Sequence, residues 1–306
     1  MSHVFKTIAV ASAFCHQIFA SYFVSYTVNP EDVRVVAPSN VHTPLVNHPC
    51  EHSDAYDVIL HDGYPLNFTS RDFTGKFIRR ASGVNLIPNP LGFSHTGAVV
   101  IATPQEVIEI LDHLSDPTNH TSGYTPQPRS LELMRERLGE FPGDTLIPFC
   151  LEANGTPGQV MSGVLPHVQI TPLAQSVAEY NGNVYVRQLS TPVPHHLMIE
   201  FIRRNLGRPY EGVSTFKTLL RSTLDKNQSE DTSRVFCSEC VALLYRQTLG
   251  LNIPNVSNII PEEFGSAAGE HDVLRGYAGD EIQLKLQFIY DEGYDSCCCR
   301  PKCLLL

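Results

Sequence analysis

The stretch Phe236-Cys237-Ser238-Glu239-Cys240-Val241 carries the strongest signal in this chain of 306 residues. The stretch begins within an extended apolar pair, Val235-Phe236, and opens a run with helical periodicity, which predicts a helix over 238–248 that is closed by Gly250. Cys237 then lies where the extended chain turns into the helix. Unpaired N–H groups and the partial positive charge of a helix N-terminus favour the thiolate, which is the reactive form of cysteine. Cys237 is therefore a candidate nucleophile.

The second cysteine of this stretch lies one helical turn further on. Cys240 falls in line with the apolar residues of the predicted helix, where a cysteine behaves as a small core residue. Two other interpretations of the pair remain open, a redox-active Cys-x-x-Cys and half of a zinc site. The domain contains no second pair of this kind, so we expect no metal. Cys237 itself could also be an inert buried thiol.

Three earlier segments add to this stretch in a fixed order. They are Phe93-Ser94-His95-Thr96-Gly97-Ala98-Val99-Val100, Cys150-Leu151-Glu152-Ala153 and Leu206-Gly207-Arg208-Pro209-Tyr210. Together with the cysteine stretch they resemble the Ser-His-x-Gly, Leu-Glu-Ala, Gly-x-Pro-Tyr and Cys-Ser-Glu-Leu-Val motifs of the permuted papain-like, NlpC-type cysteine amidases of the YiiX/YaeF-like group. In that group the histidine strand comes first and the cysteine helix last. The resemblance covers about residues 54–290.

The resemblance implies a role for each matching residue. His95 would take the proton of Cys237, and Glu152 would accept the other His95 N–H and orient the ring. The thiolate would then attack an amide, ester or thioester without a cofactor. Tyr210 would line the pocket or bind the oxyanion. Taken singly, His95 equally fits an ordinary strand histidine and Glu152 a solvated strand end, so only the joint order supports these roles.

The expected fold class is α+β, with a mainly antiparallel sheet. The resemblance makes it a circularly permuted papain-like fold, in which the catalytic helix packs against the sheet. Strands are predicted at 57–60, 96–101, 145–152, 183–189 and 280–290, and helices at 130–138, 193–207, 212–222 and 238–248. A further helix begins after a capping box at Thr103 with Glu106. Residues 103–143 form a helical insertion, predicted to be a lid or wall of the substrate site.

Residues 291–306 form a cysteine-rich tail that ends in Cys303-Leu304-Leu305-Leu306. This is a C-a-a-X box, and leucine at its last position favours geranylgeranylation of Cys303. One lipid chain gives only reversible membrane binding, and S-palmitoylation of Cys297, Cys298 and Cys299 would supply the second signal. The tail predicts a prenyltransferase as a partner and attachment to the cytoplasmic face of a membrane.

Residues 1–53 are interpreted as an N-terminal extension and linker, because the chain is rich in proline, asparagine and histidine over 29–50. An apolar run follows Lys6 and contains an Ala-x-Ala pattern, so residues 1–20 could alternatively be a signal peptide of a secreted protein. Prenyl transfer occurs in the cytosol, so the tail argues against that alternative. The formal net charge of -10 argues against a nucleic-acid partner.

Three functions are compatible with these features. The first is a cysteine hydrolase that cleaves an amide, ester or thioester bond at a membrane surface, with a lipid or a lipidated protein as the candidate substrate. The second is a thiol acyltransferase on lipid substrates, which would use the same acyl-enzyme. The third is a catalytically silent, prenylated membrane adaptor. Retention of the ordered trio His95, Glu152 and Cys237 favours an enzyme.

Overall fold

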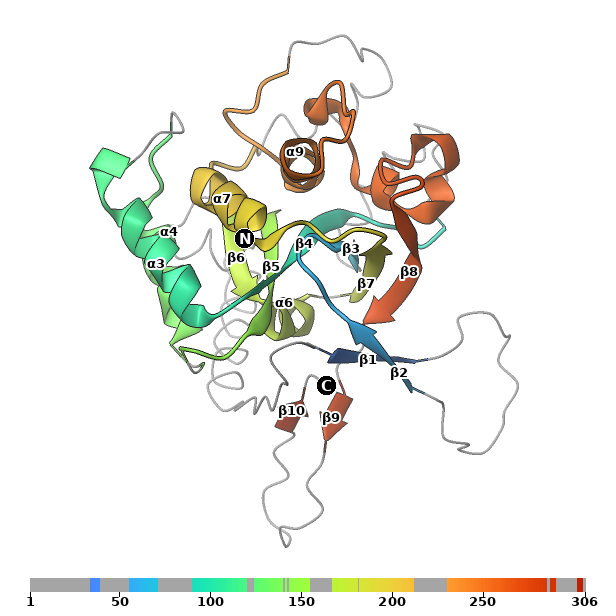
Figure 1. The fold of residues 1–306 in the computed structure, drawn as a ribbon, viewed down its shortest axis with the longest axis horizontal. Helices are drawn as coiled ribbons and strands as arrows, with labels where there is room; N and C mark the ends of the chain where they lie inside the picture. The colour runs from blue at the N-terminus through green and yellow to red at the C-terminus, as the bar shows by residue number, and fades with distance from the viewer. Residues whose placement is uncertain are drawn as a thin grey trace, which may run out of the picture.

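The computed structural model describes residues 34–38, 55–70, 90–119, 124–139, 141, 143–154, 167–180, 182–211, 230–284, 287–289 and 302–304. Its centre is a six-stranded antiparallel sheet (Figure 1) with the strand order β6-β5-β4-β3-β7-β8. The bounds of the strands are β3 Pro65–Ser70, β4 His95–Ala102, β5 Ile147–Asn154, β6 His167–Pro172, β7 Gly182–Leu189 and β8 Ala278–Leu284. The expected α+β class with a mainly antiparallel sheet is confirmed.

The helix that begins at the candidate nucleophile, α9 (Cys237–Thr248), packs across β4 and β5. Helix α7 (His195–Asn205) lies beside α9, and α6 (Leu173–Glu179) packs on β5 and β6. The core between these elements is continuous and apolar, and it includes Phe68, Phe149 and Leu244. Burial of this kind of surface supplies most of the free energy that stabilises such a sheet and its helices.

The insertion consists of α3 (Pro104–Ser115), the short 3-10 helix η1 (Pro117–Asn119) and α4 (Pro128–Leu138). The two α-helices pack on each other, beside α7 and β6 (Figure 1). The capping box is confirmed, because Thr103 Oγ1 accepts from the Glu106 N–H at 3.1 Å and Glu106 Oε2 accepts from the Thr103 N–H at 2.8 Å. This pairing satisfies two of the otherwise unpaired groups at the helix start.

Other predicted elements differ from the structure in extent. β3, β6 and α6 were not predicted, and the predicted helix over 212–222 lies outside the described residues. The strand predicted over 280–290 is wrong in its extent, since β8 already ends at Leu284. There the ladder with β7 ends, at the pair Val184 and Leu284, and β9 (Gln287–Ile289) pairs instead with β10 (Lys302–Leu304).

The chain outside the main sheet is described only in part. Within the predicted linker, β1 (Arg34–Pro38) forms an antiparallel pair with β2 (Ala55–Ile59). Residues 1–20 and the cysteines Cys297, Cys298 and Cys299 lie outside the described residues. Cys303 lies in β10, and only its backbone is described. Within the part of the chain that the structure describes, no helix is long and apolar enough to cross a membrane.

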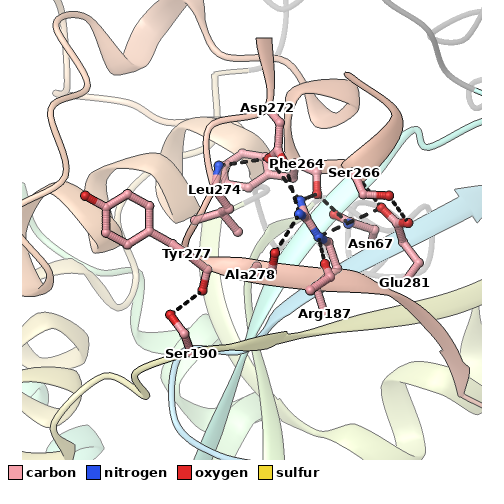
Figure 2. Close-up of polar contacts among 11 residues, drawn as sticks. Asn67, Arg187, Ser190, Phe264, Ser266, Asp272, Leu274, Tyr277, Ala278 and Glu281 are labelled. Atoms are coloured by element: carbon pink, nitrogen blue, oxygen red, sulfur yellow. Dashed lines mark hydrogen bonds and ion pairs between the residues drawn. The ribbon is translucent and has the colours of Figure 1, made fainter. Parts of the chain in front are cut away.

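A buried arginine fixes the segment after α9 to the sheet (Figure 2). The guanidinium of Arg187 forms a two-pronged ion pair with Asp272, at 2.9 Å for each nitrogen, and donates to the Phe264 carbonyl at 2.7 Å. Asn67 Nδ2 also donates to the Phe264 carbonyl, at 3.1 Å, and Asn67 Oδ1 accepts from the Thr96 hydroxyl at 2.9 Å. The segment that contains the 3-10 helices η3 (Pro261–Phe264) and η4 (Ser266–His271) is thereby linked to the strand of His95.

Candidate active site

The candidate nucleophile occupies the first position of α9. The preceding residue, Phe236, is extended, with φ −99° and ψ −179°, so the chain changes direction at Cys237 as the sequence predicts. The Phe236 N–H donates to Glu239 Oε2 at 3.0 Å, and the Ser238 hydroxyl donates to the Ile259 carbonyl at 2.7 Å. These bonds hold the first turn of the helix. The leading N–H groups of an α-helix have no acceptor within the helix, so a helix start of this kind can bind a ligand oxygen.

The two candidate partners of Cys237 lie on neighbouring strands. His95 begins β4 and Glu152 lies near the end of β5, and His95 Nε2 is 2.5 Å from Glu152 Oε2. The exposed fractions are 8% for His95, 4% for Glu152 and 5% for Cys237. The three residues that the sequence singles out are therefore all buried, and water does not screen their interactions effectively.

The charge state of His95 follows from these neighbours. Burial alone would lower its pKa, but the negative charges of Cys237 and Glu152, together with hydrogen bonds to both side chains, raise the pKa to about 10. Burial would raise the pKa of Glu152, yet His95 and the hydrogen bonds to the carboxylate hold it below its usual value. The two shifts favour the charged forms of both partners, an imidazolium and a carboxylate.

Two side chains that the sequence analysis did not identify hold the carboxylate. Gln169 Nε2 donates to Glu152 Oε1 at 2.9 Å from the facing position of β6, and Asn154 Nδ2 donates to the same oxygen at 3.3 Å. Glu152 thus uses one oxygen for His95 and the other for two amides. The alternation of polar and apolar residues in His167-Val168-Gln169-Ile170-Thr171 is a strand signal for β6, although it does not predict that Gln169 pairs opposite Glu152.

An aromatic pair surrounds the imidazole ring. Phe68 meets His95 edge-on, with ring centroids 5.1 Å apart, and Tyr180 stacks on it at 5.9 Å with an interplanar angle of 24°. Phe68 and Tyr180 also contact each other, with centroids 4.7 Å apart. These contacts restrict the orientation of the ring in addition to the bond from Glu152, and they supply the apolar surroundings that strengthen the ion pair.

The other described cysteines differ from Cys237 in their surroundings. Cys150, Cys237 and Cys240 are all free thiols, so the Cys-x-x-Cys pair forms no disulfide. Burial raises the pKa of Cys240 to about 12 and raises the pKa of Cys150 well above the ordinary value. Both thiols belong to the apolar core, in agreement with the structural role predicted for Cys240. Among the described thiols, Cys237 is the one whose thiolate interacts with an imidazole.

Tyr210 lies in the segment alongside the chain that enters α9. Its backbone pairs with Val235, two residues before Cys237, and its side chain is partly buried against the core. Its role at the oxyanion stays a prediction. In the described residues, no group of three or more histidine, cysteine, aspartate or glutamate side chains could hold a metal ion. No protein-family model and no curated protein matches this chain, so inference about its function rests on the site itself.

Proposed function

We propose that this chain is a cysteine hydrolase of the permuted papain-like, NlpC-type class. The observation that carries the proposal is the contiguous set Cys237–His95–Glu152: a thiol at a helix N-terminus interacts with an imidazole that a buried carboxylate orients. A nucleophile, a base and an orienting group in this order of contact form the usual arrangement for acyl transfer. The order histidine strand, glutamate strand and cysteine helix supports the permuted version of the fold.

The steps follow from the geometry. The Cys237 thiolate attacks the carbonyl carbon of the substrate and forms a C–S bond, and the leading N–H groups of α9 stabilise the oxygen that becomes negative. The His95 imidazolium gives its proton to the leaving nitrogen, oxygen or sulfur as that bond breaks. Water then attacks the thioester while His95 takes a proton from it, and rupture of the C–S bond regenerates the thiolate. Glu152 keeps its negative charge throughout and stabilises the imidazolium.

The C-terminal tail supports a location for this activity. A prenyl group on Cys303 would attach the enzyme to a membrane surface, with Cys297, Cys298 and Cys299 as the second anchoring signal. The bond that is cleaved would then belong to a lipid or a lipidated protein. An acyltransferase would form the same acyl-enzyme and pass the acyl group to an acceptor other than water.

The experiment that tests the proposal is intact-mass analysis of the purified protein after incubation with a lipid and peptide extract. The expected result is an acyl adduct that maps to Cys237 and is absent from Cys237→Ala. Cys240→Ala is the matched control, because it removes a thiol from the same helix that belongs to the core. An adduct that persists in Cys237→Ala, or that maps to Cys240, would contradict the proposal.

A further inference from the structure

One cationic side chain beside the candidate active site has no polar partner in the described part of the chain. Nε and Nη1 of Arg208 are buried, and no hydrogen bond or ion pair between described residues uses its guanidinium. Arg187 shows the contrast, since its buried guanidinium is matched by Asp272 and by backbone carbonyls. Burying charged donors without an acceptor costs free energy. A polar group from outside the described chain would relieve this cost.

The backbone places Arg208 between the two halves of the site. Its carbonyl accepts from the Val168 N–H of β6 at 2.8 Å, one residue before Gln169, which holds Glu152. On the other side, the carbonyl of Pro209 accepts from the Val235 N–H at 3.1 Å, two residues before Cys237. The segment 207–210 therefore joins the strand that supports the acid to the chain that leads into the nucleophile.

The side chain of Arg208 lies against the insertion. Its Cζ is 5.5 Å from the centroid of the Tyr124 ring, a cation–π arrangement. The Tyr124 hydroxyl in turn donates to the backbone carbonyls of Leu206, at 3.0 Å, and Arg204, at 2.9 Å. Arg208 is thereby held on a fixed aromatic face that comes from the insertion, whose role as a lid or wall of the substrate site stays a prediction.

The charge of Arg208 also reaches the first turn of α9. Burial raises the pKa of Cys240, and the positive charge of Arg208 opposes that rise, so the guanidinium lies within electrostatic range of this thiol. Cys240 is one turn from Cys237. The negative charge of Glu152 is matched by His95, so the Arg208 guanidinium and the positive end of the α9 dipole are the positive charges left to act on a ligand at this first turn.

We propose that Arg208 binds an anionic oxygen group of the substrate, a carboxylate or a phosphate, adjacent to the acyl bond that Cys237 attacks. This inference rests on the proposed function, because it names the substrate class of the same site. The planar guanidinium presents parallel N–H groups that match both kinds of oxyanion. Arg208 is then a specificity-determining residue that selects acyl compounds with a negative charge near the scissile bond.

The test compares two alkylating agents of similar size that differ in charge. Rates of modification of Cys237 are measured by mass spectrometry with anionic iodoacetate and neutral iodoacetamide, for wild type, Arg208→Gln, Arg208→Lys and Arg204→Gln. Arg208→Gln should lower the ratio of the iodoacetate rate to the iodoacetamide rate about tenfold, the size of one partly buried charge interaction. Arg208→Lys should retain most of the ratio. Arg204→Gln, which removes an exposed charge paired with Glu200, should leave it unchanged.

A second measurement does not require a reactive thiol. Thermal unfolding is followed with added inorganic phosphate or acetate against chloride at equal ionic strength. At least one of the two anions should raise Tm in wild type and in Arg204→Gln but not in Arg208→Gln. A larger effect of phosphate indicates a phosphate-bearing substrate, and a larger effect of acetate indicates a carboxylate-bearing substrate. The inference is overturned if wild type and Arg208→Gln have equal rate ratios. It is also overturned if the anions raise the Tm of both proteins by the same amount. If iodoacetamide fails to modify Cys237, the assignment of Cys237 as the nucleophile is contradicted. The Tm measurement would still test whether Arg208 binds an anion.

Discussion

His95 Nε2 lies 2.5 Å from Glu152 Oε2, and both side chains are almost completely buried. A buried imidazole is ordinarily held neutral, because burial penalises its charged form. Here the neighbouring Cys237 and the Glu152 carboxylate outweigh that penalty and raise the pKa of His95 to about 10. In the proposed mechanism, this proton is the one that His95 gives to the leaving group.

Replacing the carboxylate should move the alkaline limit of activity. Glu152→Gln removes one of the negative charges that raise the His95 pKa, so the imidazolium should lose its proton at lower pH. The expected results are a fall in kcat/KM of about 10²- to 10⁴-fold and a descending limb of the pH profile displaced to lower pH. An unchanged descending limb in Glu152→Gln would contradict the role of the carboxylate.

Gln169 is expected to act on the opposite limb of the profile. Its amide stabilises the charged form of Glu152, whose pKa is lowered, so the ion pair is present above that pKa and is lost as the pH falls through it. Gln169→Leu should raise the Glu152 pKa, shift the ascending limb to higher pH by up to about one unit, and reduce the rate about tenfold. Asn154→Ala, which removes the longer bond at 3.3 Å, is the matched variant and should have a smaller effect. A uniform loss of rate at every pH would indicate a structural role only.

Glu239 should make stability depend on pH. Its side chain is fully buried, and burial raises its pKa to about 8. The carboxyl therefore stays protonated in the folded protein where it is ionised in the unfolded chain, so this contribution to stability is present below pH 4.5 and is lost as the pH rises through about 8. Glu239→Gln keeps an oxygen for the Phe236 N–H and should unfold with a free-energy advantage over wild type that grows across this range, on the order of 1–3 kcal/mol.

Denaturant titrations at about pH 5, 6.5 and 8 would measure this difference. Glu270→Gln is the control, because Glu270 is an exposed carboxylate in the 3-10 helix η4, outside α9. The explanation fails if Glu239→Gln shows the same difference in stability at all three pH values.

The tail yields a prediction that is independent of catalysis. Cys303→Ser removes the acceptor of the prenyl group, so the protein should move from the membrane fraction to the supernatant in cell fractionation. Leu306→Ser is the matched control, since it keeps the cysteine and exchanges the geranylgeranyl signal for a farnesyl signal. That variant should stay with membranes. Wild type and Cys303→Ser in the same fraction would count against prenylation.

The sequence predicts the parts of this protein in which local pattern and tertiary structure agree. Periodicity and end signals predict three features of the site and its surroundings. These are the helix start at Cys237, the capping box at Thr103 and the strands around His95 and Glu152. β6 was missed although its polar and apolar residues alternate, because its identity as a strand depends on pairing with β5. The end of β8 is also a pairing effect, since the alternation continues past Leu284 while the ladder with β7 does not.

Parts of the site depend on contacts between distant segments, which no local pattern reveals. Gln169 belongs to the site because β6 places it opposite Glu152. Tyr180 belongs to the site because α6 ends beside the His95 ring. Arg208 stands at the variable position of a turn motif, where the sequence gives no reason to prefer it. Arg208 is identified as a candidate binding residue only by its surroundings. The Tyr124 ring of the insertion packs on its guanidinium, and two of its nitrogens are buried.

Labelling with an activity-based thiol probe, in wild type, Cys237→Ala, His95→Ala and Cys240→Ala, tests the central claim most directly. The proposed mechanism predicts strong labelling of wild type and Cys240→Ala, greatly reduced labelling of His95→Ala and none of Cys237→Ala. Labelling that persists unchanged in folded Cys237→Ala would contradict the assignment of Cys237 as the nucleophile.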